Sequence, residues 1–460
     1  MEPLGTSEGG RRGWHAFPIA KQAGKHADAA RMPAPANADE GMAHNLSRRG
    51  LLQWLAAVGG VSWLTPVAHL LADQAERTPG REPAQSLIFL WLAGGPSQLE
   101  TFDPQPGKSI AGGTQAIATA VKGVQLAAGY ERMAEQMPHV ALVRSVVSKE
   151  GDHERGTYLV KTGYRPDPTV IHPSIGAICC HQLPVGATEI PRHISILPQQ
   201  WPSVGGMLGK QYDAFKCDDP ATKTPDVTAR VSDARFEQRL KDLAIVEQAF
   251  NRGRSRQVQA TLHRATIESA RKMMSSEQLA AFEIDREPLE LQQAYGDTPF
   301  GRGCLAARRL TEVGVRCIEV ALGGWDTHAN NHEGHRELAK TLDAALAALL
   351  EDLRSRDLLH RTIVLCGGEF GRTPQINRLG GRDHWPHGFT MLLAGGGIRG
   401  GIVVGASDPE GGRKVESPQQ VADVHATVLS VLGIDPAHEE LAPVGRPIKF
   451  SAGRPIEQFL

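Results

Sequence analysis

Histidines and carboxylates crowd one short stretch of the sequence. "LGGWDTHANNHEGH", residues 322–335, contains Asp326, His328, His332 and His335. Imidazole nitrogens and carboxylate oxygens are typical ligands of zinc and similar divalent ions. Asp326 and His328 are two residues apart, so their side chains share one face of an extended segment. The alternative interpretation is a polar network that ties loops together, and for His332 and His335 capping or decorating the following helix is the simpler explanation.

More candidate ligands follow the next apolar run of the chain. Glu369 comes shortly after "TIVLC" (362–366), and a glycine-rich loop, "GGRDHWPHG", contributes further Asp and His residues. Arg372 could clamp an anionic oxygen with two parallel N–H groups, or could pair with Glu369. The predicted ligands of a divalent metal, zinc or similar, are Asp326, His328, Glu369, Asp383 and His384.

The elements that must position these residues are predicted strands of a parallel sheet. Residues 86–92 and 362–366 are uninterrupted apolar runs, typical of strands that are buried on both faces. Between a strand at 315–322 and the strand at 362–366, residues 335–356 carry leucines at helical spacing, which indicates a βαβ crossover. Ligands of such sheets bind beyond the carboxyl ends of the strands. We therefore expect an α/β fold with its site at that edge.

Further elements can be assigned from caps and periodicity. A strand is expected at 139–147, followed by a helix that Asp152 would cap and Gly163 would end. Apolar residues at helical spacing, with many charges between them, predict a helical insertion at about 231–290, and a helix is expected at 303–313.

Composition and charge exclude some classes of function. The 50 Lys and Arg residues nearly balance the 51 Asp and Glu residues, and aromatic residues make up only 5% of the chain. This balance predicts no nucleic-acid partner, because such partners require basic surfaces and stacking platforms. The six cysteines follow no C-x-x-C metal-binding spacing.

The N-terminal region indicates export. Residues 42–75 include "SRRGLL" followed by an apolar run at 51–64, which is shorter than the ~20 residues that a membrane-spanning helix needs. This pattern resembles a twin-arginine signal, so the Tat translocase is an expected partner and the periplasm or cell envelope the expected location. Residues 1–41 have no periodicity and are interpreted as a disordered or untranslated extension.

Several motifs together resemble one bacterial family. "GGPSQLETFDPQPG", "EGDHERGTYLVKTGYRP", "GGWDTHANN" and "GEFGRTPQIN…GGRDHWPHG" are similar to the family called domain of unknown function 1501. That family is sulfatase-like and is placed in the alkaline phosphatase superfamily. The resemblance implies a three-layer α/β sandwich over residues 85–460, with a mostly parallel central sheet, helices on both faces, and a bimetal pocket in active relatives.

The sequence departs from that superfamily at functional positions. Glu369 and Phe370 occupy the place of an Asp-His metal pair, and Asn330 replaces a ligand histidine for which His328 could substitute. His153 stands where a Cys, Ser or Thr nucleophile is expected. Without that nucleophile no ordinary phospho- or sulfo-enzyme intermediate can form.

Two functions from different classes follow. The first is an exported metal-dependent hydrolase of phosphate or sulfate esters, acting on a small anionic ester or on a sulfated or phosphorylated glycan. In this interpretation Asp152 or His153 assists water and Arg372 binds the anion. The second is a non-catalytic protein that keeps the fold and binds or assembles with an envelope protein.

Overall fold

A computed structural model describes residues 82–222, 224, 227–252 and 263–460. The chain divides into two compact units, Met1–Arg77 and Thr78–Leu460, and all of the described residues belong to the second. The expected extension and the expected export signal therefore lie outside the described residues. Within the described ranges, no helix combines the length and the apolar character needed to cross a membrane.

The centre of the second unit is a nine-stranded, mostly parallel sheet. β1 (Ser86–Leu92) begins and ends at the residues predicted for it. β7 (Cys317–Leu322) and β8 (Thr362–Gly367) lie parallel to it on its two sides. β5 (His193–Ile196) and β6 (Phe215–Cys217) extend the sheet beyond β7, again in parallel.

On the other side of β8, the strand β11 (Phe389–Gly395) runs against the direction of the other strands of the sheet. It is antiparallel both to β8 and to β4 (Val140–Val147). β12 (Ile402–Val404) and β13 (Gln419–Gln420) lie parallel to β4. The predicted βαβ crossover is confirmed, although it passes over β1. β11 takes the opposite direction because a loop, rather than a crossover helix, connects it to β8.

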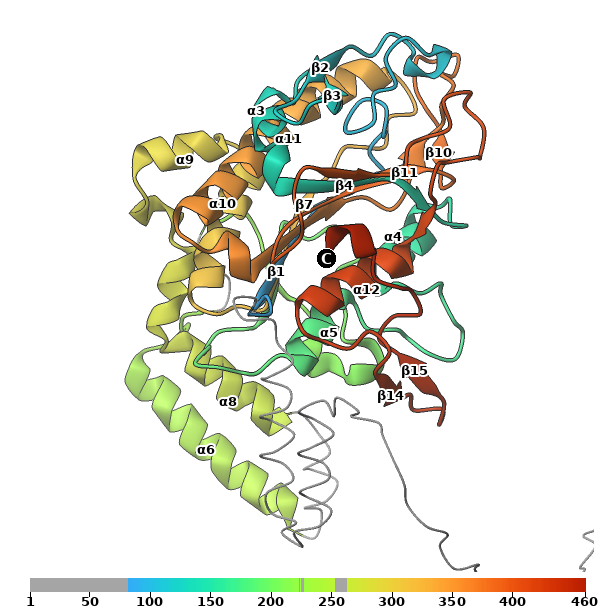
Figure 1. The fold of residues 1–460 in the computed structure, drawn as a ribbon. Coiled ribbons are helices and arrows are strands. Elements are labelled where there is room, and N and C mark those ends of the chain that lie inside the picture. Colours follow the sequence, from blue (N-terminus) through green and yellow to red (C-terminus); the bar gives the residue numbers. More distant parts are fainter. Residues whose placement is uncertain (1–81, 223, 225–226, 253–262) are drawn as a thin grey trace, which may run out of the picture. The chain divides into compact units, whose positions relative to one another are not determined.

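One layer of helices covers the first face of the sheet (Figure 1). It contains α3 (Glu131–Gln136), α10 (Pro299–Glu312) and α11 (Asn331–Ser355). Their apolar side chains pack against Ile88 and Leu90 of β1. α11 begins four residues before the predicted helix and includes His332 and His335.

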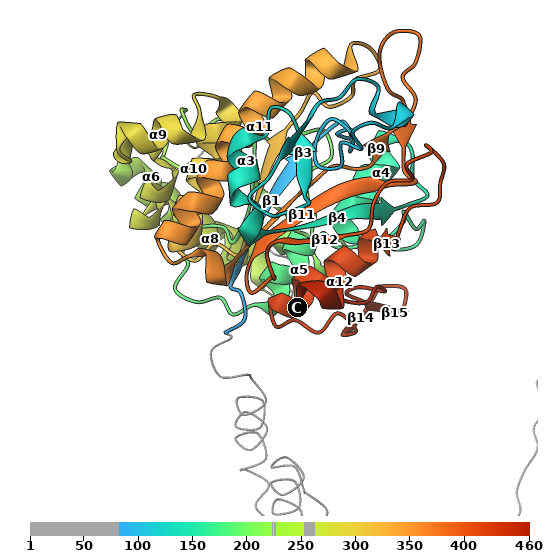
Figure 2. The ribbon, with the colours of Figure 1, turned by 45° about the horizontal axis from the view of Figure 1, so that its top comes forward.

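The opposite face carries α4 (His153–Thr162), α5 (Ile175–Gln182) and α12 (Val421–Val431), as Figure 2 shows. Leu87 and Phe89 pack on this side because successive residues of a strand point to opposite faces. The three-layer architecture expected from the sequence is therefore confirmed.

Helices also occupy the region predicted as an insertion. α6 (Asp233–Asn251) has no buried residue, and α8 (His263–Met274) and α9 (Leu289–Tyr295) follow it. The remaining short strands form three two-stranded sheets, which are β2 (Ala116–Ala118) with β3 (Gln125–Ala127), β9 (Gly371–Arg372) with β10 (His384–Trp385), and β14 (Glu439–Leu441) with β15 (Pro447–Lys449).

His425 of α12 makes the stability of this fold depend on pH. Its side chain is buried and its Nε2 donates to the Val160 carbonyl oxygen at 2.8 Å. Burial lowers the pKa of His425 to about 4, whereas an unfolded histidine titrates near ~6.5. As the pH falls from about 6.5 to about 4, protons therefore bind the unfolded chain first, and this residue alone should lower the free energy of unfolding by about 3 kcal/mol.

Urea unfolding at a series of pH values tests this expectation. His425→Gln should flatten the fall in unfolding free energy between pH 6.5 and 4, while the exposed His360→Gln should leave it unchanged. Equal slopes for wild type and His425→Gln would show that the imidazole is not held neutral.

Candidate metal centre

Loops from four parts of the fold meet at the carboxyl edge of the sheet. His153 is the first residue of α4 and follows β4. Asp326 and His328 follow β7, and Glu369 follows β8. His384 lies on β10 opposite Arg372 of β9. The structure thus brings together residues that are far apart in the sequence.

Three imidazoles surround the carboxylate of Asp326. Its Oδ1 lies 3.0 Å from Nε2 of His328 and 3.3 Å from Nε2 of His384. Its Oδ2 lies 3.3 Å from Nε2 of His153. Single ligand atoms of His153, Asp326 and His384 all lie within 4.8 Å of one another. This spacing allows a shared ion, because ligand atoms on opposite sides of a metal can be ~4 Å apart.

The other ring nitrogen of each histidine is held by a hydrogen-bond acceptor. His153 Nδ1 lies 2.7 Å from Glu369 Oε1, and His328 Nδ1 lies 2.8 Å from Asp383 Oδ1. His384 Nδ1 donates to the carbonyl oxygen of Gly151 at 2.7 Å. Since each Nδ1 must donate its hydrogen, each neutral ring has its lone pair on Nε2.

With neutral rings, the Nε2 atoms that face Asp326 are therefore acceptors rather than donors. Nε2 of His328 and Nε2 of His384 are 3.1 Å apart, and both face Asp326 Oδ1. Lone pairs at these distances repel one another unless a cation or a proton lies between them. A zinc-like ion satisfies all three atoms, and anchored Nδ1 groups are what orients metal-binding histidines in proteins.

Glu369 and Asp383, both predicted as metal ligands, each bond the Nδ1 atom of a histidine in this structure. Glu369 is buried, and its Oε1 accepts from Gly94 N at 2.9 Å as well as bonding His153. Asp383 holds His328, and Asn377 Nδ2 approaches the same carboxylate oxygen at 3.4 Å. Both carboxylates thus fix the tautomer and the orientation of a histidine.

Electrostatics keeps Asp326 ionised. Burial by itself would raise the pKa of Asp326, but Arg372, His153 and His384 together lower it to about 2. The hydrogen bond to Glu369 raises the pKa of His153, while burial lowers that of His384. The centre thus combines a permanently charged carboxylate with one basic and one weakly basic imidazole.

Arg372 pairs with Asp326 rather than with Glu369. Its buried guanidinium donates from Nη2 to Asp326 Oδ1 at 2.6 Å and to the carbonyl oxygen of Gly94. Nε donates to Gly95 O at 2.8 Å, and Nη1 donates to Arg382 O at 3.1 Å. With these bonds in place, Arg372 holds the loops together instead of offering a free fork to an anion.

Other candidates have structural roles. Asp152 caps α4, as its position predicts, because its Oδ1 accepts from Arg155 N at 2.9 Å. His332 Nε2 lies 2.9 Å from Gly112 O. The ring of His335 is buried, and its Nε2 accepts from Ser97 N at 2.8 Å. All six cysteines are buried and none forms a disulfide.

Sequence reasoning missed a cavity beside the histidines. It has a volume of about 230 Å³ and includes His153 and Glu369 in its lining. One wall comes from Gln199, Gln200 and Trp201 in the loop that follows β5. The sequence signal was "PQQWP", two amides and an indole between prolines just after an apolar strand.

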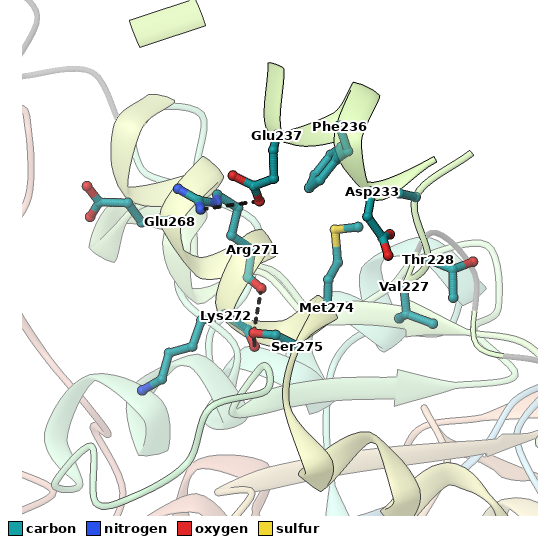
Figure 3. Close-up of a pocket in the computed structure, with 11 residues that line it drawn as sticks. Val227, Thr228, Asp233, Phe236, Glu237, Glu268, Arg271, Lys272, Met274 and Ser275 are labelled. Carbon is teal, nitrogen blue, oxygen red and sulfur yellow. Dashed lines mark hydrogen bonds and ion pairs between the residues drawn. The ribbon is translucent and has the colours of Figure 1, made fainter. Parts of the chain in front are cut away.

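A second hollow, of about 650 Å³, lies between α6 and α8 (Figure 3). Glu237 and Arg271 face each other across it with an N···O separation of 4.0 Å. No histidine and no residue of the metal centre lines it. Its chemistry does not extend the site at the sheet edge.

The chain belongs to a family described as "Protein of unknown function (DUF1501)", whose model matches residues 84–460. The resemblance seen in the motifs is therefore confirmed at the level of the family. No curated protein matches the chain.

Solved structures with a similar fold include three enzymes. A sulfatase from Pseudoalteromonas sp. has 10% identity and a TM-score of 0.37, with 80% of this chain and 70% of that one covered. The lipoteichoic acid synthase LtaP from Listeria monocytogenes has 10% identity and a TM-score of 0.37, with 80% of this chain and 74% of that one covered. The alkaline phosphatase from the Antarctic bacterium TAB5 has 12% identity and a TM-score of 0.35, with 77% of this chain and 99% of that one covered. At such low identities and TM-scores, the activities of these proteins are not transferred to this chain.

Elemental analysis of the purified protein tests the metal centre. We expect one zinc or similar ion per chain, and Asp326→Ala combined with His328→Ala should remove it. Asp383→Asn should weaken metal binding by ~10–100-fold, because it replaces the carboxylate that orients His328.

His332→Ala is the matched control, since this histidine lies in the same segment outside the centre and should retain the ion. A metal-free wild-type protein after dialysis against zinc would contradict the assignment.

Proposed function

We propose that this protein is a metal-dependent hydrolase of phosphate or sulfate esters. The observation that carries the proposal is the meeting of His328 Nε2, His384 Nε2 and Asp326 Oδ1 within 3.3 Å, while the Nδ1 atom of each ring already faces another acceptor. Such a set of acceptors suits a divalent cation.

Asp326, His328 and His384 are the residues that would hold the ion. Two imidazoles and one carboxylate leave coordination positions open, as catalytic sites require and structural zinc sites do not. When bound, the ion would supply Lewis-acid activation of water and of the ester oxygen. Arg372 keeps Asp326 in place, and Asp383 and Gly151 keep the two histidines in place.

His153 is the residue we propose to move a proton. Its Nδ1 is bonded to Glu369, its Nε2 lies 3.3 Å from Asp326 Oδ2, and the residue lines the cavity. A histidine whose basicity is raised by a carboxylate can donate a proton to the departing oxygen. Water attacks the ester directly in this mechanism, because a histidine stands where a nucleophilic Ser, Thr or Cys would form a covalent intermediate.

We place this activity outside the cytoplasm. The twin-arginine pattern at 42–75 supports this placement, with the Tat translocase as the export partner. The substrate would then be a small anionic ester or a sulfated or phosphorylated glycan of the envelope.

A binding or assembly protein is the second candidate function. It is favoured by the replacement of the nucleophile by His153. In that case the centre would organise the loops of a binding surface for an envelope protein.

An ester-hydrolysis assay distinguishes the hydrolase from the binding protein. The zinc- or manganese-loaded protein is assayed with 4-nitrophenyl phosphate and with 4-nitrophenyl sulfate. Chelation should abolish turnover, and no burst phase should precede it, because no covalent intermediate forms. His153→Ala should keep its metal and lose ~10²–10⁴-fold in kcat, as expected for a proton-transfer group.

Asp326→Ala should lose both metal and activity. If the fully metal-loaded protein hydrolyses neither ester, the hydrolase proposal fails and the binding function remains.

A further inference from the structure

Five segments of the fold line the cavity beside His153: the end of β1 with its turn, α4, and the loops after β5, β7 and β8. Its volume of about 230 Å³ is below the ~300–1,000 Å³ of pockets that hold a drug-sized ligand, so it can take a single ring or one part of a larger molecule. The lining residues beyond His153 and Glu369 are Trp91, Ala93, Gly94, Thr157, Gln199, Gln200, Trp201, Gly323 and Gly324.

The charge of this lining disfavours an anionic ligand. His153 and Glu369 are its only ionisable side chains, and neither lysine nor arginine contributes. Oε1 of Glu369 is occupied by Gly94 N and His153 Nδ1, whereas Oε2 is buried without a hydrogen-bond partner. The buried carboxylate charge of Glu369 beside the cavity disfavours a second anion there.

A buried lysine behind the cavity does not change this balance. Lys161 is almost fully buried, and its Nζ donates to Glu319 Oε1 at 2.9 Å and to Trp201 O at 2.8 Å. The ammonium also lies 5.0 Å from the ring centre of Trp91. Glu319 thus neutralises the charge of Lys161, and the ammonium lies against the indole of Trp91.

The same ion pair holds one wall of the cavity in place. Glu319, on the central strand β7, also accepts from Ser195 Oγ at 3.0 Å and from Ser203 Oγ at 2.7 Å. Together with the bond from Lys161 to the Trp201 carbonyl, these contacts fix both ends of the loop that carries Gln199 and Gln200. A wall fixed in advance loses little conformational entropy on binding.

The remaining lining suits a ring that carries hydroxyl groups. Gln199 and Gln200 are exposed amides that can both donate to and accept from hydroxyls. The partly exposed Trp201 offers a flat apolar face for C–H groups. Gly323 leaves room for this wall, since a Cβ there would lie 3.2 Å from Gln199 Oε1.

We propose that this cavity binds an uncharged, polyhydroxylated ring, such as a neutral sugar residue. This inference rests on the proposed hydrolase function. In that function, the ring is the part of the substrate next to the ester group, and the anionic group itself lies at the metal centre. Gln200 and Trp201 recognise the ring, and Glu369 excludes charged rings.

Saturation-transfer NMR with neutral methyl hexosides and their uronate counterparts tests the proposal. The probes are methyl glucoside, galactoside and mannoside, each compared with the corresponding uronic acid glycoside at pH 7.5. At least one neutral ring should bind, at least tenfold more tightly than its uronate. Gln200→Ala and Trp201→Ala should each weaken binding at least tenfold, and Glu369→Gln should reduce the discrimination against the uronate.

Trp385→Ala is the matched control, because this indole lies outside the cavity and its loss should leave ring binding unchanged. Circular dichroism checks that each variant is folded. The proposal is overturned if no neutral ring binds, if uronates bind as tightly, or if both cavity variants bind like wild type. These measurements need neither metal nor turnover, so a protein that binds the ring without hydrolysing esters refutes the hydrolase alone.

Discussion

The buried guanidinium of Arg372 is the constraint on which the rest of the site depends. It donates to carbonyl oxygens in the turn after β1 and in the loop before β10, and to the carboxylate of Asp326 after β7. A planar, permanently charged group with fixed donor directions can make these bonds only if the segments hold fixed relative positions. Removing Asp326 would leave the buried guanidinium without its carboxylate partner.

Close backbone approaches follow from this convergence. Gly94 has φ +116°, and a Cβ there would lie 2.5 Å from Asp326 N; at Gly381 a Cβ would lie 1.9 Å from His328 O. Only glycine tolerates such contacts, and at Gly94 only glycine adopts the backbone conformation readily. The glycines in the glycine-rich runs of the sequence therefore allow the strand ends to pack closely around Arg372. They also allow His328 to lie against His384.

Local patterns predicted much of this fold and about half of the centre. The apolar run of β1 and the leucine spacing of α11 depend on near neighbours, and so does the relation of Asp326 to His328, two residues apart on an extended segment. The direction of β11 and the wall formed by Gln199 to Trp201 depend on contacts between distant segments, which spacing does not encode. One signal was nevertheless present, because Glu319 is a charge inside an otherwise apolar strand and such a charge must find a buried partner.

Glu369 shows why residue type alone did not identify the roles of the carboxylates. Carboxylates at strand ends can bind metal, accept from histidines or face a ligand, and only the contacts distinguish these uses. Here Oε1 is already shared by Gly94 N and His153 Nδ1. The same side chain orients His153 on one side and lines the cavity on the other. A single carboxylate thus lies between the candidate metal centre and the cavity, because it bonds a histidine of the one and lines the other.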